Sequence, residues 1–134
     1  MSKEGKIWFV CLHGSAKSLI ASKMGEHLAQ KTGMSGIRFG HAGTEADAKV
    51  PPHVVQGLKD DGIDVSGEKP NAASAALLSD ATHVVSFGPD IRTLAPPGAK
   101  VEYWKDVPNV ADGYESAREA IVRKVESLLD GLGS

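Results

Sequence analysis

The sequence is poor in cysteine: Cys11 is the only one among 134 residues. One cysteine cannot form an internal disulfide, and it rules out a metal site built from several cysteines. An excess of charge of either sign is also missing, because 15 basic residues face 17 acidic ones and the formal net charge is −2. With no basic run, the composition gives no reason to expect nucleic acid or a membrane surface as a partner.

Long hydrophobic runs are missing too. The apolar run IWFV at residues 7–10 is shorter than the core of a signal peptide, and no run approaches the roughly 20 residues that span a membrane. We therefore expect a cytoplasmic protein. The 41% hydrophobic and 24% charged residues are ordinary for a globular protein. The chain is long enough to form one domain, residues 1–134, with a buried core.

Short apolar runs alternate with amphipathic stretches along the chain. We expect strands at residues 7–10, 37–41, 82–87 and 100–104, and helices at residues 18–32, 51–61, 71–81 and 116–132. The last helix has a regular apolar face made of Ala117, Ile121, Val125 and Leu128. Alternating strands and helices predict parallel βαβ units. The predicted fold is α/β, a flavodoxin-like three-layer sandwich with a central four-stranded parallel sheet and helices on both faces.

The loop at residues 11–18, CLHGSAKS, joins the first expected strand to the first expected helix. Main-chain amides in such a loop and at a helix start lack partners, and with the helix dipole they form an anion site. Gly14 permits the positive φ that a tight curl needs, and Lys17 adds a positive charge. The same field would stabilise a thiolate at Cys11, to which Ser18 is placed to donate a hydrogen bond.

Two other kinds of site do not fit the sequence. A nucleotide-binding P-loop, G-x-x-x-x-G-K-[ST], requires glycine at the positions of Cys11 and Ala16. His41, His53 and His83 lie apart, without the spacing of metal ligands. We therefore expect no metal and no cofactor.

The loop VCLHGSAKS resembles the C-x5-R-S loop of low-molecular-weight protein tyrosine phosphatases and of the related arsenate reductases, whose loops commonly have the sequence C-x-H-N-S-A-R-S. Further similar segments follow in the order of that family, at residues 40–70, 81–87 and 101–112. The resemblance therefore covers most of the chain.

The resemblance implies a role for each residue of the loop. Cys11 would be the nucleophile that attacks phosphorus or arsenic, supported by Ser18. The cradle for the anion would be formed by main-chain amides of Leu12, His13, Gly14, Ser15, Ala16, Lys17 and Ser18. The ligand would be phosphate, sulfate, an arsenate-like oxyanion or a phosphomonoester.

Three positions depart from the family pattern. Lys17 replaces the arginine that grips two oxygens of the anion with its planar fork. Gly14 replaces a bracing asparagine, which predicts a looser loop. Asn109 and Val110 stand where the family has the Asp-Pro pair that supplies the general acid, and asparagine cannot donate that proton. Asp106 is a substitute acid if the loop shifts.

The single cysteine also limits the route of any arsenate reduction. A thioredoxin-coupled arsenate reductase needs two further cysteines, so an external small thiol would have to act as reductant. Outside the loop, Trp104 and Asn109 are candidates for the wall of the pocket. Within the loop, His13 is a candidate for its rim.

These departures leave alternatives to a cysteine-dependent phosphatase or arsenate-reductase-like enzyme. One is a catalytically impaired oxyanion-binding or regulatory relative. Another is an interaction module that uses the surface around His13 and Trp104. The retention of both Cys11 and Ser18 favours an enzyme.

Overall fold

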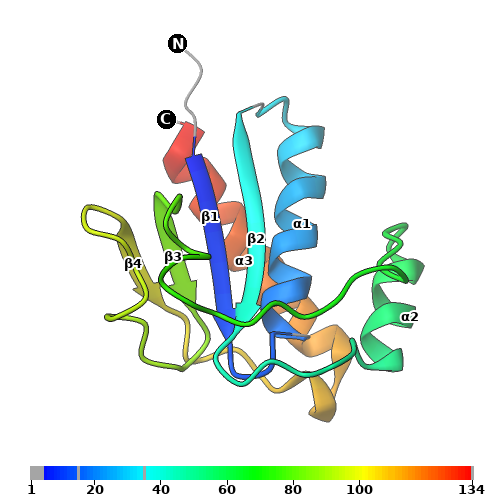
Figure 1. The fold of residues 1–134 in the computed structure, drawn as a ribbon. Coiled ribbons are helices and arrows are strands. Elements are labelled where there is room, and N and C mark those ends of the chain that lie inside the picture. Colours follow the sequence, from blue (N-terminus) through cyan, green and yellow to red (C-terminus); the bar gives the residue numbers. More distant parts are fainter. Residues whose placement is uncertain (1–4, 15, 35, 134) are drawn as a thin grey trace.

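The computed structural model describes residues 5–14, 16–34 and 36–133. These residues form four strands and three α-helices, with one short 3-10 helix before the last helix, and only β3 and β4 follow each other without a helix between them (Figure 1). In order they are β1 (Gly5–Cys11), α1 (Lys17–Lys31), β2 (Ile37–Gly43), α2 (Pro52–Asp60), β3 (His83–Ser86), β4 (Lys100–Tyr103), η1 (Val110–Asp112) and α3 (Tyr114–Gly133).

The four strands form one parallel sheet in the order β2-β1-β3-β4. The predicted α/β fold with a four-stranded parallel sheet is therefore confirmed. On one side, strand β1 pairs with β2, and the last pair is Cys11 opposite Gly43. On the other side it pairs with β3, and the last pair is Val10 opposite Ser86. Because the chain moves to one side of β1 and later to the other, the strand order reverses there. The carboxyl end of β1 is thus the place where such sheets bind ligands.

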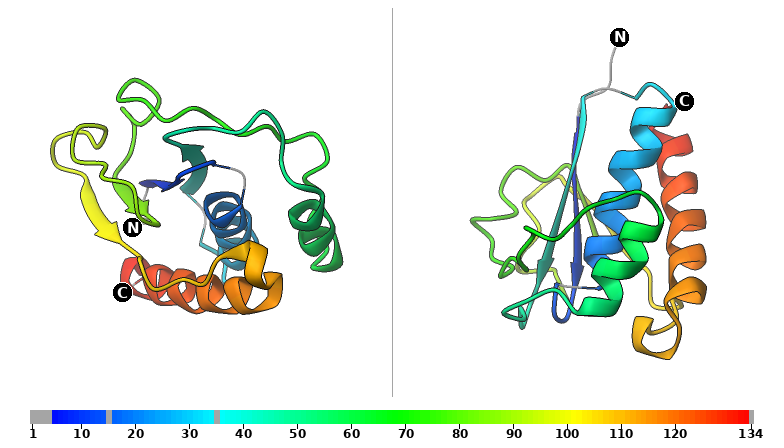
Figure 2. Two further views of the ribbon diagram at one scale, coloured as in Figure 1. Left: turned by 90° about the horizontal axis from the view of Figure 1, so that it is seen from below. Right: turned by 90° about the vertical axis from the view of Figure 1, so that its right-hand side faces the viewer.

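The side chains of β1 alternate between two hydrophobic clusters, as a fully buried strand requires. Ile7, Phe9 and Cys11 belong to the main core, where α1 and α3 cover the sheet. Figure 2 shows these two helices side by side on one side of the sheet. Trp8 and Val10 belong to a second cluster on the opposite face.

No helix covers that second face within the described ranges; turns cover it instead. The predicted helix at residues 71–81 is wrong, because the segment begins as extended chain. Ala72 forms a parallel bridge with Gly43, and Ser74 Oγ then accepts the amide of Leu77, so residues 75–80 form turns. The segment buries few side chains, among them Leu78, and so it has no apolar face to stabilise a helix.

Helix α3 largely follows the predicted apolar face. Ala117, Ile121 and Val125 are fully buried. Leu129 rather than Leu128 completes the row, since a spacing of four residues continues to position 129, and Leu128 is only partly buried. Within the described ranges, no helix has both the length and the apolar character needed to cross a membrane.

Candidate active site

A cavity of about 690 Å³ opens at the carboxyl end of β1. It brings together the loop after β1, the segment between β2 and α2, the loop after β3 and the segment that contains η1. The residues that line it are Cys11, Leu12, His13, Ala16, Lys17, Asp47, Pro51, His53, Phe87, Gly88, Pro89, Asn109, Val110, Ala111 and Asp112. Of the predicted site residues, the cavity is thus lined by Cys11, Leu12, His13, Ala16, Lys17 and Asn109, whereas Gly14 and Ser18 are not among its lining residues. Ser15 lies outside the described residues.

The sulfur of Cys11 is held by polar groups at the floor of this cavity. The amide of Gly14 donates to Sγ over 3.1 Å, and the hydroxyl oxygen of Ser18 lies 3.0 Å from the same sulfur. Cys11 is only 7% exposed, and Ser18 is fully buried. The Gly14 amide is the donor in the first contact, whereas either the hydroxyl or the thiol can donate in the second.

Gly14 has the left-handed conformation that the loop requires, with φ of +67°. A Cβ at this position would lie 2.6 Å from the main-chain nitrogen of Gly43, so no side chain fits. Its carbonyl oxygen instead lies 3.3 Å from Nδ1 of His41, a buried residue of β2. Gly14 therefore has no brace of its own, as its lack of a side chain implies, but His41 of β2 lies within hydrogen-bond distance of its carbonyl oxygen.

The loop is also fixed to the segment that follows β2. The amides of Thr44 and Glu45 donate to the carbonyl oxygens of Cys11 and Leu12, over 3.1 Å and 2.7 Å. At the rim, Nδ1 of His13 lies 3.2 Å from a carboxylate oxygen of Asp47. The two side chains at the rim are 53% and 41% exposed, as the predicted rim position of His13 requires.

Lys17 begins α1 and reaches the late loop. Its ammonium donates to the carbonyl oxygen of Val107 over 3.1 Å. Among the described residues, Ala16 gives α1 no side-chain cap, and its first turn contains no Asp or Glu. The amides and the positive dipole end at this helix start are therefore available to an anion.

Asp106 is not one of the residues that line the cavity, and its predicted role as general acid is not supported. Its carboxylate accepts from Lys124 on α3 over 2.9 Å and is 74% exposed. This hydrogen bond lowers the pKa of Asp106 below its ordinary value, so that at neutral pH the carboxylate carries no proton to donate. Asp112 at the end of η1 lines the cavity in its place.

Residues 6–132 match the sequence profile of the low molecular weight phosphotyrosine protein phosphatases. The chain belongs to this family. The arsenate reductase of Bacillus licheniformis is 30% identical over 129 residues, which cover 93% of this chain and 88% of that protein. The family is of the cysteine-based phosphatase and reductase type, and the predicted resemblance is therefore confirmed.

Two solved structures have the same fold. A mutant of the YwlE arginine phosphatase with a phosphorylated active-site serine is 20% identical, with a TM-score of 0.83 and 96% of each chain covered. The tyrosine phosphatase Wzb of Escherichia coli K30, in complex with sulphate, is 15% identical, with a TM-score of 0.78, and 97% of this chain and 99% of that chain are covered.

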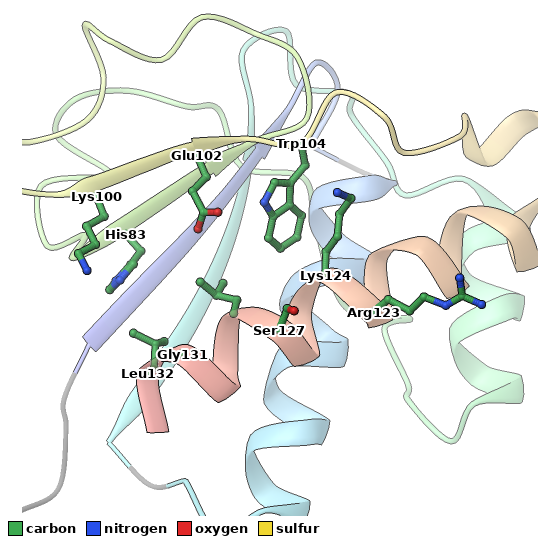
Figure 3. A pocket seen from close by; sticks show the side chains of 10 residues that line it. His83, Lys100, Glu102, Trp104, Arg123, Lys124, Ser127, Gly131 and Leu132 are labelled. Carbon is green, nitrogen blue, oxygen red and sulfur yellow. The ribbon is translucent and has the colours of Figure 1, made fainter. Parts of the chain in front are cut away.

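In this phosphatase-family chain, Trp104 is a core residue rather than a wall of the cysteine pocket. It is 7% exposed, and its ring lies 5.8 Å from that of Phe9 and 5.7 Å from that of Phe87. Figure 3 shows its indole facing a second cavity of about 590 Å³ between β4 and α3. Lys124 rises toward the indole there, with its ammonium 5.8 Å from the ring centroid. The aromatic wall of the cysteine pocket is Phe87.

Several cavity residues were missed by the sequence analysis. They are Asp47, Pro51, His53, Phe87, Gly88, Pro89, Val110, Ala111 and Asp112. Most of them follow the carboxyl ends of β2 and β3, which meet the end of β1 at one edge of the sheet. The rule that ligands bind at the carboxyl ends of parallel strands therefore predicts most of these residues. Within the described residues, no group of three or more His, Cys, Asp or Glu side chains could hold a metal ion.

Proposed function

We propose that this chain is a cysteine-dependent phosphatase that binds a tetrahedral oxyanion in the loop Cys11–Ser18 and forms a covalent intermediate on Cys11. The observation that carries the proposal is the position of the sulfur. It lines a cavity large enough for a phosphomonoester, with the Gly14 amide and the Ser18 hydroxyl within hydrogen-bond distance.

Oxyanion binding is supported by the positive groups that surround the sulfur. Ala16 and Lys17, at the uncapped start of α1, line the same cavity as Cys11. An ammonium has three hydrogens, so Lys17 can donate to Val107 and still bind an anion. Sulphate is bound by the related Wzb phosphatase.

The proposed reaction has two displacements. The thiolate of Cys11 attacks phosphorus, so that a P–S bond forms while the ester P–O bond breaks, and the leaving oxygen takes a proton from an acid. Water then attacks the phosphocysteine and gives a proton back to the deprotonated acid, so that a P–O bond forms while the P–S bond breaks; this releases inorganic phosphate and restores both the thiolate and the acid. Asp112 is the proposed acid, because it lines the cavity while Asp106 pairs with Lys124 outside it.

A second candidate function is an oxyanion-binding relative without turnover. Two observations favour it: an amide side chain, Asn109, faces the cavity, and Lys17 is already engaged by Val107. An arsenate reductase is a weaker candidate, because Cys11 is the only cysteine and an external thiol would have to resolve the intermediate.

Hydrolysis of p-nitrophenyl phosphate by the wild type and by Cys11→Ser tests the proposal. We expect turnover that is lost in Cys11→Ser and retained in Asp64→Asn, a matched change of an exposed residue that does not line the cavity. Sulfate-dependent thermal stabilisation without turnover would support the binding protein instead. If neither turnover nor stabilisation by sulfate or phosphate is found, both functions are wrong.

A further inference from the structure

We propose that His41 is the positioning residue that holds the Cys11–Ser18 loop in its anion-binding shape, by donating a hydrogen bond from Nδ1 to the carbonyl oxygen of Gly14. An effect of His41 on turnover is expected only if the proposed phosphatase function is correct. Its effect on the reactivity of Cys11 can be measured without turnover.

The environment of His41 determines which of its nitrogens carries the proton. The side chain is 6% exposed, and burial lowers its pKa, so that the imidazole is neutral at neutral pH. A neutral imidazole has one N–H group. The neighbour of Nδ1, at 3.3 Å, is the carbonyl oxygen of Gly14, which can only accept a hydrogen bond. Nδ1 must therefore carry the proton.

Gly14 is the one residue that connects this hydrogen bond to the sulfur of Cys11. Gly14 accepts from His41 with its oxygen and donates to Cys11 Sγ with its nitrogen, over 3.1 Å. Once the carbonyl is fixed, rotation of the residue is restricted, and its N–H stays directed at the sulfur. Gly14 cannot brace itself, because a Cβ there would collide with the main chain at Gly43.

His41 is itself held from two sides. In β2 it is paired with Phe9 of β1. On the other edge, the side-chain amide of Asn71 donates to the carbonyl oxygen of His41 over 3.0 Å, and the carbonyl oxygen of Asn71 accepts the amide of Gly43 over 2.8 Å. The imidazole is therefore presented to the loop by a rigid segment, as a positioning residue requires.

The test compares His41→Leu, which removes the donor, with His41→Asn, whose side-chain nitrogen replaces Nδ1. His83→Leu is the matched control, since His83 is a partly buried histidine on β3 that hydrogen-bonds to Thr82 and does not line the cavity. Alkylation of Cys11 by iodoacetamide is measured as a function of pH, together with stabilisation by sulfate.

We expect His41→Leu to slow alkylation at pH 6.5 by up to about tenfold, the upper end of the effect of one lost hydrogen bond between neutral groups, and to shift the pH profile of alkylation to higher pH. His41→Asn should stay within about threefold of the wild type, as should His83→Leu. A folded His41→Leu variant with the wild-type profile would overturn the proposal. A merely structural role of His41 would lower thermal stability without moving that profile.

Nitrogen-15 NMR of the imidazole in the wild-type protein keeps the proposal testable if His41→Leu does not fold. We expect Nδ1 to be protonated at neutral pH, and an unprotonated Nδ1 would overturn the proposal. Because neither measurement uses a substrate, a protein without phosphatase activity would contradict the proposed function and leave the role of His41 intact.

Discussion

The ammonium of Lys17 and the carbonyl oxygen of Val107 are joined by a hydrogen bond of 3.1 Å. This contact connects the first residue of α1 to the loop that follows β4, two segments 90 positions apart in the sequence. One side chain thus lines the cavity with a positive charge and also binds the loop that follows β4.

The two roles of Lys17 can be separated by substitution. Lys17→Met removes a charged donor, and we expect it to weaken sulfate and phosphate binding by about 10- to 100-fold. Lys17→Arg supplies a planar fork that suits a tetrahedral anion, and it should bind phosphate at least as tightly as the wild type. Calorimetric titration with phosphate measures both. Unchanged affinity in Lys17→Met would show that Lys17 serves only the contact with Val107.

Asp112 and Asp106 form a matched pair, because one lines the cavity and the other binds Lys124 outside it. We expect Asp112→Asn to lower kcat by about 10² to 10⁴, as loss of a general acid does, and Asp106→Asn to change it less than about threefold. The loss should be larger with phenyl phosphate than with p-nitrophenyl phosphate, whose leaving group needs less protonation. If both variants lower kcat equally, or if Asp112→Asn loses the same factor with both substrates, Asp112 is not the general acid.

The sequence predicted the sheet and the loop because their signals are local. A short apolar run such as residues 7–10 fits only a buried strand, and the spacing from Cys11 to Ser18 lies within one loop. The helix at residues 71–81 was predicted from its alanine content. What decides its structure is the main-chain pairing of this segment with Gly43, a contact with a distant part of the chain that composition does not reveal.

The site residues divide in the same way. In the sequence His41 is an isolated histidine, because its partner Gly14 lies 27 positions away and comes close to it only when β1 and β2 pair in register. Asp112 was missed, and Asp106 was chosen, because position in a loop does not show which carboxylate faces inward. Trp104 likewise follows a predicted strand, and its position in the sequence does not distinguish a pocket wall from the core, where the structure places it.

Gly14 and Gly33 both have positive φ, of 67° and 73°, but differ in their surroundings. A Cβ on Gly33 would meet nothing within 4 Å, whereas one on Gly14 would collide with Gly43. Gly33→Ala should therefore cost about 1–2 kcal/mol of unfolding free energy, the cost of the left-handed conformation alone. Gly14→Ala should cost about 3 kcal/mol or more, and it should also slow alkylation of Cys11. Urea unfolding followed by circular dichroism measures the difference, and equal costs would show that the loop is not held against β2.

The lowered pKa of His41 predicts how stability changes with pH. Burial is the main cause, and the nearby Glu68 and Lys23 act in opposite directions and are paired with each other. In the unfolded chain the imidazole takes up a proton near its ordinary value of 6.5, while in the folded protein it does so only at lower pH. The unfolded state therefore binds more protons below about pH 6.5, and the free energy of unfolding must fall as the pH falls through this range.

His41→Asn removes this titration and serves as the matched comparison, while the pKa of His83, which is also lowered, remains in both proteins. The drop in Tm between pH 7.5 and pH 5.5 should be larger for the wild type than for His41→Asn. Scanning calorimetry at the two pH values measures it. Equal drops would mean that the folded protein accommodates a charged His41 as readily as water does, and the imidazole would then not be the buried, neutral donor on which the geometry of the loop depends.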